Sequence, residues 1–413
     1  MQRLNALTDL LRHLLKWLLI AFVVAVLAGS ASAGFLFALD WATRTRLAHA
    51  WLIWLLPVAG FAVGWLYLRY GSSVEGGANL LLDEIHDPKK IIPLRMAPLV
   101  LGGTVISHLF GASVGREGTA VQMGGALADQ LTRMLRLNND DRRIILMAGI
   151  SAGFASVFGT PLAGAIFGLE VLAIGRLRYE AMLPCLAAAV IADQVGLWWG
   201  VQHTHYAVPL TPALSAWPLC AMVIAGVLFG VTGKVFAQAT HGLSGLMKRW
   251  IGYAPLRPLA GGLAVAIAVW LLGTDRYIGL GIPTIVEALK QPLPAHDFLG
   301  KMAFTIVSLG TGFKGGEVTP LFFIGATLGN ALGPLLHQPV TLLAAIGFVA
   351  VFAGAANTPI ASTLMAMELF GAEIGVYAAI ACVVAYLFSG HAGIYRAQRS
   401  GHAKRTLHND TDT

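Results

Sequence analysis

Long apolar stretches, separated by short polar or glycine-rich breaks, run through most of the chain. Many of them suit membrane helices, since crossing roughly 30 Å of hydrocarbon takes about 20 residues. The clearest predicted spans cover residues 14–39, 51–70, 96–110, 144–172, 181–199, 216–235, 258–272, 341–355 and 376–388. Other apolar segments, after Gly118, Gly316 and Thr358, are too short or too glycine-rich to cross straight. Broken helices persist only inside protein or beside a watery cavity, so we expect a solvated pathway through the middle.

Two stretches of the first half recur about half the chain later. GREGTAVQMGGA at residues 115–126 resembles GGEVTPLFFIGA at 315–326, and TPLAGAIFGLE at 160–170 resembles TPIASTLMAME at 358–368. The first pair places one glutamate each, Glu117 and Glu317, in a glycine-rich break. Each glutamate precedes a segment, 119–131 or 319–332, whose pattern predicts a helix that starts at the motif. Such duplication in an apolar chain favours a membrane transporter built from structural repeats.

Composition and charge agree with a bilayer protein. The 413 residues are 56% hydrophobic and only 12% charged, with a mean hydropathy of +0.70, which excludes an ordinary soluble domain. The net charge of +7 concentrates at both ends, so we expect cytoplasmic termini. Internal basic clusters lie between spans and are interpreted as interfacial anchors rather than a nucleic-acid surface. They comprise Lys89, Lys90 and Arg95; Arg133, Arg136, Arg142 and Arg143; and Lys248, Arg249 and Arg257.

The N-terminus also imitates a secretory signal, with basic residues, an apolar run and the small residues Ser30, Ala31, Ser32 and Ala33. We favour a membrane helix, because the apolar run continues through Phe35 and exceeds a usual signal core.

Neither a metal nor a cofactor is expected. The three cysteines, Cys185, Cys220 and Cys382, lie far apart inside apolar segments. His203 and His205 form a conceivable metal pair, but neither a thiol nor a carboxylate lies near them in the sequence.

Carboxylates in the apolar part of the chain carry the candidate chemistry, because an ionised acid in a membrane is costly and usually marks an ion or proton path. Glu117 and Glu317 lead, since each adjoins an expected helix N-terminus, where unpaired N–H groups and the helix dipole form an anion site. A glutamate there can occupy the site when ionised and vacate it when protonated, which couples proton movement to anion movement. Alternatively, Glu117 pairs with Arg116, or Glu317 serves a packing network. Glu170 and Glu368, at equivalent ends of the repeated helices, are interpreted as capping or interhelical residues.

These motifs carry a family resemblance. GREGTAVQ resembles the central GREGP-x-V-Q signature of the CLC family of anion channels and proton-coupled anion antiporters. GGEVTPLFFIGATLG is similar to the downstream family signature, and the two Thr-Pro helices and the terminal GIYRAQR follow in family order. The resemblance covers about residues 14–396.

The resemblance implies an all-α polytopic membrane protein with a CLC-type fold of two inverted-topology helical repeats, whose helices are broken and tilted. It implies a cytoplasmic segment at 1–13, repeats at 14–205 and 206–396, and a tail at 397–413 without a regulatory domain. It also implies a homodimer with one anion pathway per subunit. Glu117 becomes the gating glutamate, Tyr395 the central tyrosine, and the N–H groups of Glu317 and Val318 anion donors.

Departures from the usual family pattern concern the substrate. Where a GSGIP motif supplies a chloride-binding serine, this chain has Gly76, Gly77, Ala78, Asn79 and Leu80, whereas GLGIP at 279–283 is interpreted as its echo in the second repeat. Thr119 replaces the proline of GREGP, Glu317 and Thr319 stand in the downstream motif, and Val171 replaces an internal proton-relay glutamate. This set resembles the fluoride-exporting CLC branch. Asn79 and Thr319 can supply the close donors that strongly hydrated fluoride requires.

We therefore predict a proton-coupled fluoride antiporter, not an enzyme, that exports fluoride against inward protons and confers fluoride resistance from the bacterial inner membrane. The predicted gating and proton-transfer residues are Glu117 and Glu317. The predicted anion-binding residues are Gly115, Arg116, Glu117, Asn79, Glu317, Val318, Thr319 and Tyr395, with ring edges of Phe322 or Phe323 as an addition to their packing role. A CLC channel or antiporter for chloride or another anion stays open. An intramembrane enzyme is disfavoured, because Ser107 and His108 are adjacent and point apart, and no GxSxG surrounds a candidate serine.

Overall fold

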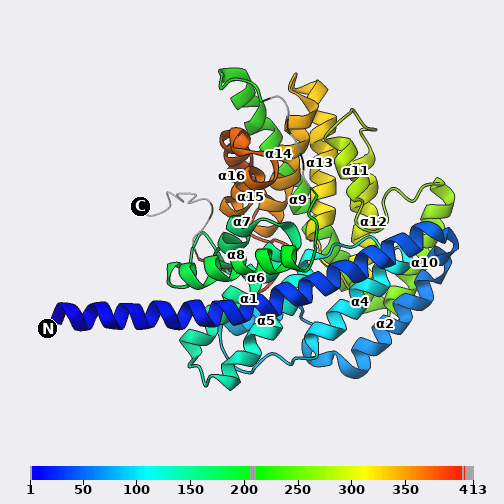
Figure 1. Ribbon diagram of the computed structural model, residues 1–413. Helices are drawn as coiled ribbons and strands as arrows, with labels where there is room; N and C mark the ends of the chain where they lie inside the picture. The colour runs from blue at the N-terminus through cyan, green and yellow to red at the C-terminus, as the bar shows by residue number, and fades with distance from the viewer. Residues whose placement is uncertain (1, 205, 207, 209–210, 402–403, 405–413) are drawn as a thin grey trace, which may run out of the picture.

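The computed structural model describes residues 2–204, 206, 208, 211–401 and 404, which form sixteen α-helices and very little sheet (Figure 1). The first eight helices are α1 Gln2–Ala48, α2 Leu56–Tyr70, α3 Ala78–His86, α4 Met96–Phe110, α5 Glu117–Met134, α6 Asn139–Phe158, α7 Pro161–Glu170 and α8 Met182–Trp198. The second eight are α9 Ala216–Trp250, α10 Leu256–Leu272, α11 Ile282–Ala288, α12 Asp297–Thr311, α13 Val318–Leu335, α14 Val340–Ala356, α15 Pro359–Phe370 and α16 Gly375–Phe388. Strands β1 Ala173–Ile174 and β2 Arg399–Ser400 pair in parallel.

The second eight helices repeat the first eight in order, and two of the pairs have equal lengths. Helices α4 and α12 have 15 residues each, and both end at a glycine in the left-handed conformation, Gly111 with φ +93° and Gly312 with φ +110°. Helices α5 and α13 have 18 residues each. The Thr-Pro helices α7 and α15 both carry proline in the first turn, where its missing N–H costs nothing. Glycine and proline thus set the same helix boundaries in both halves. The division near residue 205 remains a prediction.

The two repeats meet at a short backbone bridge. Gly115 N donates to Gly316 O at 2.6 Å, and Gly316 N donates to Gly115 O at 2.8 Å. This pairing makes Gly115 the structural equivalent of Gly316, whereas the sequence motifs align Gly115 with Gly315. The motif alignment is therefore wrong by one residue. Since α5 begins at Glu117 and α13 at Val318, the residue equivalent to Glu317 is Arg116, and the two acidic residues occupy different positions at their helix starts.

The helices differ in how much of their surface is buried. Among the described residues, five helical segments are long and apolar enough to span a membrane: 7–48, 50–70, 179–198, 216–250 and 318–335. Helix α14, apolar on every side, is buried from Leu342 to Ala356 and packs against α13 and α16. Helix α9 buries one face and exposes Val223, Ile224 and Leu228 on another. Exposed apolar side chains of this kind suit hydrocarbon, which fits a polytopic membrane protein.

Two predicted spans differ from the structure. Residues 144–172 are not one helix, because Gly159 adopts φ +70° at the C-cap of α6 and Pro161 starts α7 in a new direction. The helix predicted at 14–39 extends over all 47 residues of α1, which corresponds to about 70 Å at 1.5 Å per residue. It runs without a break through Ser30 and Ala33, the segment that resembles a cleavage site. Its N-terminal end projects past the other helices (Figure 1).

Candidate functional site

The N-termini of α5 and α13 come together beside the Gly115–Gly316 bridge. Both ends carry unpaired N–H groups and the positive end of a helix dipole, so the junction favours an anion. A cavity of about 20 Å³ opens here, with Arg116, Glu117 and Thr319 in its wall. A cavity holds one water once it offers about 10–15 Å³, so this one accommodates a particle of roughly that size. The remainder of its wall is largely apolar and includes Phe158, Ile282, Ile285, Phe322, Phe348 and Leu369.

Glu117 directs its carboxylate toward the first turn of α13. The side chain is fully buried, and Oε2 accepts hydrogen bonds from Thr319 N at 3.1 Å and Thr319 Oγ1 at 2.5 Å. Oε2 also accepts from Arg116 N at 3.2 Å, while Oε1 accepts from Arg116 Nε at 3.3 Å. The Arg116–Glu117 ion pair that the sequence left open is therefore present, and competition with an anion stays a prediction. Gly115 makes this possible, because a Cβ there would lie 3.1 Å from Glu117 Oε2 and 2.9 Å from Gly316 O.

Glu317 lies on the opposite side of the same junction as the N-cap residue of α13. Its Oε2 atom lies 3.9 Å from the position that a Cβ on Gly118 would occupy. Glu117 thus reaches across to α13, and Glu317 reaches back to α5. The N–H of Thr319 donates to the Glu117 carboxylate, and the anion-donor role of the Glu317 and Val318 N–H groups stays a prediction. Val318 itself is buried in the first turn of α13.

Neither Asn79 nor Tyr395 lines the small cavity. Gly77, with φ +58°, precedes the first turn of α3, in which Asn79 lies. Asn79 Oδ1 accepts a hydrogen bond from Ala397 N at 2.9 Å, which ties α3 to the segment that carries Tyr395. The Tyr395 ring is buried and meets the edge of Phe167 at a centroid distance of 6.4 Å. Asn79, rather than Ala78, therefore makes the polar contact at this place.

The two phenylalanines of α13 have different surroundings. Phe322 lines the cavity and stacks on Phe348, with ring centroids 4.0 Å apart. Phe323 faces elsewhere, and the Lys301 ammonium lies 5.3 Å from its ring centroid. Lys301 donates to Tyr277 O at 3.1 Å and to the carbonyl of Gly279, the first residue of the GLGIP segment, at 2.6 Å. Of the pair, only Phe322 can present its ring to an ion in this cavity.

His203 also lines the cavity, a position that sequence reasoning did not predict. Its Nε2 lies 3.8 Å from Asp193 Oδ1 of α8. A Cβ on Gly159 would lie 2.6 Å from the His203 ring, so the glycine that ends α6 also makes room for the imidazole. His205 lies outside the described residues. Groups of three or more metal-ligating side chains do not occur among the residues that the structure describes.

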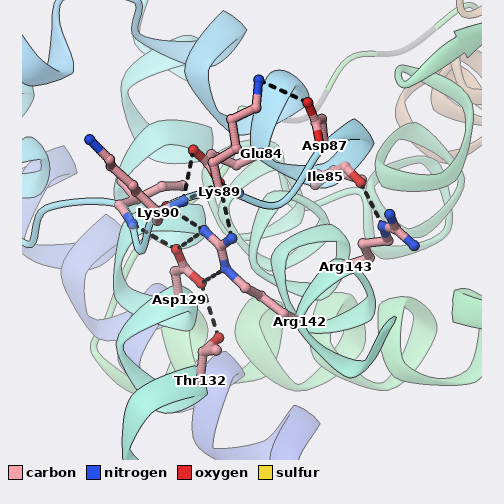
Figure 2. A network of polar contacts seen from close by, with 10 residues as sticks. Glu84, Ile85, Asp87, Lys89, Lys90, Asp129, Thr132, Arg142 and Arg143 are labelled. Atoms are coloured by element: carbon pink, nitrogen blue, oxygen red, sulfur yellow. Dashed lines mark hydrogen bonds and ion pairs between the residues drawn. The ribbon is translucent and has the colours of Figure 1, made fainter. Parts of the chain in front are cut away.

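Arg142 anchors the helix that carries Asn79 (Figure 2). Its guanidinium donates to Asp129 Oδ1 and Oδ2 at 2.8 Å each and to Glu84 Oε2 at 2.9 Å. Lys90 O accepts a further hydrogen bond at 2.7 Å. Arg142 is only 4% exposed, so its interpretation as an interfacial anchor was wrong: it joins α6 to α3 and α5. Arg143, in contrast, reaches Ile85 O and the exposed Asp140.

Glu170 and Glu368 cap each other's helices. Glu170, at the end of α7, accepts from Ile360 N and Ala361 N at 3.1 and 2.8 Å, in the first turn of α15. Glu368, near the end of α15, accepts from Leu162 N and Ala163 N at 2.8 and 2.9 Å, in the first turn of α7. The predicted architectural role of both residues is confirmed. Val171 follows directly, and its carbonyl accepts from Gln398 Nε2 at 3.0 Å.

Comparison with known proteins supports this description. The family model described as "Voltage gated chloride channel" matches residues 59–390. The chain is 67% identical over 402 residues to a protein of Pseudomonas syringae pv. tomato named "Chloride/fluoride channel protein", covering 96% of this chain and 89% of the relative. A crystal structure of a CLC-type fluoride/proton antiporter has a TM-score of 0.91 at 36% identity and covers 94% of this chain and 98% of its own. A slow cyanobacterial Cl⁻/H⁺ antiporter shares the fold, with a TM-score of 0.79 at 21% identity over 92% of this chain and 96% of that one.

The fold and the paired helix N-termini thus define a polytopic membrane protein of the ion-transporting class. The chain belongs to the voltage-gated chloride channel (CLC) family. The predicted fold class and family are confirmed.

Proposed function

We propose that this protein is a proton-coupled antiporter that exports fluoride in exchange for inward protons and so confers fluoride resistance. The observation that carries the proposal is the buried Glu117 carboxylate, held by the N–H and O–H groups of Thr319. An anion in the cavity would use the same donors, so ionised Glu117 and a transported anion compete for them. Protonated Glu117 loses its charge and leaves the donors to the anion.

Fluoride suits the cavity better than chloride by size and by chemistry. The fluoride ion has nearly the radius of a water molecule, and the cavity of about 20 Å³ is close to the minimum for one water. Fluoride also needs strong donors in place of its hydration shell, and Thr319 offers two at one position. The relatives named for fluoride, one at 67% and one at 36% identity, support the same substrate.

Glu317 provides a second proton-binding group. Its carboxylate faces Gly118, the residue after the gate, and Val171 has no titratable side chain at the position of the usual internal glutamate. A proton that leaves Glu117 therefore has an acceptor on α13 rather than on α7. Separate positions for the two acids, one inside α5 and one at the N-cap of α13, suit two separate roles.

The cytoplasmic side of the pathway belongs to Asn79 and Tyr395. Asn79 commits Oδ1 to Ala397 N, which leaves its amide donors for an anion entering from that side. Gly115 and Arg116 are the remaining anion-binding residues at the cavity. Gly115 leaves space for the Glu117 carboxylate, and Arg116 contributes a positive charge.

We also propose a homodimer, and we assign its contact to the exposed apolar faces of α7, α8, α15 and α16. Leu162, Leu186, Val190, Ile360, Val376 and Val383 are each 38–49% exposed and lie on these helices, which pack against one another. We place the homodimer contact there and the protein in the bacterial cytoplasmic membrane. The enzyme alternative is disfavoured further, because Ser107 Oγ donates to Gly103 O and His108 Nδ1 contacts Thr104 O, so they do not form a dyad.

The deciding experiment measures fluoride efflux from proteoliposomes with an ion electrode outside and a pH dye inside. Fluoride release with internal acidification and little chloride flux supports the exchanger. Chloride flux comparable to fluoride flux would leave the CLC family assignment intact and favour the chloride alternative.

A further inference from the structure

A second, larger cleft lies away from the Glu117 cavity, where the end of α3, the turn after β1 and strand β2 meet. Its volume is about 480 Å³, enough for a molecule far larger than a halide ion. Three arginines and one histidine line it: Arg176, Arg178, Arg399 and His86. Glu180 is the one acidic residue in its described wall, and it pairs with Arg178 at 3.2 Å.

The basic side chains are brought together by backbone pairing rather than by acidic partners. Arg399 N donates to Leu172 O at 3.2 Å, and Gly401 N donates to Ile174 O at 3.1 Å, which fixes β2 beside β1. A Cβ on Gly401 would lie 2.9 Å from Arg176 Cγ, so the stem of Arg176 packs across the strand. Within the described chain, neither Arg176 nor Arg399 has an acidic side chain within 4.0 Å. The positive charges of Arg176 and Arg399 repel each other, and a bound anion would reduce this repulsion.

The His86 imidazole is exposed to the positive charges of the same arginines. His86 Nε2 donates to Leu172 O at 2.8 Å, so it lies against the strand that β2 joins. Burial lowers the pKa of His86 below its ordinary value, and the charges of Arg399 and Arg178 lower it further, against the raising effect of the Leu172 hydrogen bond and Asp83. A negative group in the cleft would oppose these charges.

We propose that this cleft binds a phosphate group, either the headgroup of an anionic lipid or a free phosphate compound, between Arg176 and Arg399. Guanidinium groups form planar two-pronged hydrogen bonds with phosphate oxygens, and three arginines line this one cleft. A halide ion cannot accept the paired hydrogen bonds of a guanidinium group on two separate oxygens, and it would fill only a small part of the cleft.

Occupancy would act on the anion pathway through the chain that connects them. Arg399 follows Tyr395 by four residues, Ala397 N binds Asn79, and Gln398 Nε2 donates to Val171 O and Ala356 O. A phosphate bridging Arg176 and Arg399 therefore fastens the segment from Tyr395 to Gly401 against the turn that follows β1. This second site regulates the rigidity of the Tyr395 segment and does not depend on which halide is transported.

The test uses the full-length protein in nanodiscs of neutral phosphatidylcholine, with either phosphatidylglycerol in the bilayer or inorganic pyrophosphate in the buffer. Hydrogen exchange of the amides at 395–401 and thermal stability are measured at matched ionic strength, with sodium chloride as the non-phosphate control. We expect at least a tenfold slowing of exchange with one of the two phosphate sources, and which source acts identifies the ligand.

Matched variants separate the cleft from a general charge effect. Arg176→Gln with Arg399→Gln should abolish the slowing, and Arg176→Lys with Arg399→Lys should weaken it while keeping the charge. Arg133→Gln with Arg249→Gln removes the same charge from exposed positions outside the cleft and should leave the response intact. An equal response to sodium chloride, an equal loss in the exposed pair, or no response of the folded wild type to either phosphate source would overturn the proposal. This test does not measure fluoride transport, so it stays valid even if the proposed fluoride antiport is disproved.

Discussion

Gly115 and Gly316 exchange two backbone hydrogen bonds across the centre of the molecule, at 2.6 and 2.8 Å. The pair joins equivalent points of the two repeats and brings two helix N-termini to one place. A side chain on either glycine would clash with the backbone of the other repeat. A Cβ on Gly115 would lie 2.9 Å from Gly316 O, and one on Gly316 would lie 2.7 Å from Gly118 N. The site depends on this close approach as much as on its charged residues.

Glu117→Gln should abolish proton coupling, because the amide can neither carry the proton nor compete as an anion for Thr319. Fluoride and proton fluxes measured together in proteoliposomes check this. Proton-linked fluoride movement in the variant, at the wild-type ratio, would contradict the gating role.

Thr319→Val removes the hydroxyl donor to Glu117 and keeps the backbone N–H. Losing one hydrogen bond to a charged group costs about 1.5–3 kcal/mol, so we expect fluoride affinity to fall by about tenfold or more. Thr319→Ser should restore it, since the hydroxyl returns. Fluoride dependence of efflux is the measurement, and unchanged affinity in the valine variant would remove Thr319 from the anion site.

Glu317→Ala tests the second acid, with Glu317→Gln as the variant of matched size. Both should slow proton transfer while the anion cavity keeps its Thr319 donors. We expect reduced exchange with a lower ratio of protons to fluoride, measured by the pH dye and the electrode in the same vesicles. Exchange at the wild-type rate and ratio in both variants would tell against a proton role.

Glu170→Ala and Glu368→Ala each leave two N–H groups of the opposite helix without their acceptor. Loss of a helix N-cap typically costs about 0.5–2 kcal/mol, so each variant should melt at a lower temperature in detergent. Glu373→Ala, at an exposed position, is the control. Equal melting of all three variants and the wild type would show that the caps contribute nothing.

Arg142→Met leaves the carboxylates of Glu84 and Asp129 buried without their cation. Breaking a buried ion pair in this way costs about 3–5 kcal/mol, so we expect a large loss of thermal stability. Adding Glu84→Gln and Asp129→Asn should restore much of it, because the uncompensated charges disappear. A triple variant less stable than Arg142→Met would refute this account.

Local signals in the sequence predicted a helix that starts at the glycine-rich motif of Glu117 and another after the Thr-Pro pair that includes Pro359, because glycine and proline leave few backbone choices there. They also predicted the capping roles of Glu170 and Glu368 from symmetry alone. The burial of Arg142 was not predictable locally, since Glu84 lies 58 residues away in the chain. The place of His203 in the cavity wall was missed for the same reason, because the contact of its ring with Gly159 depends on tertiary packing.

The one-residue error in aligning the repeats has a physical origin. The two motifs match best in letters when Glu117 is placed on Glu317, but hydrogen bonding selects Gly115 and Gly316 as partners. Letter matching thus placed Glu117 and Glu317 at equivalent positions, whereas the fold provides one acid on a helix and one at an N-cap.

The crossed caps of Glu170 and Glu368 carry a consequence for the origin of the fold. In each half, the first N–H groups of the Thr-Pro helix are capped by a carboxylate from the other half. An ancestor with a single copy would have satisfied these groups only by pairing with a second, oppositely inserted copy. Gene duplication and fusion would then have made a reversible partnership permanent, and the two halves, translated today as separate fragments, should still need each other to assemble.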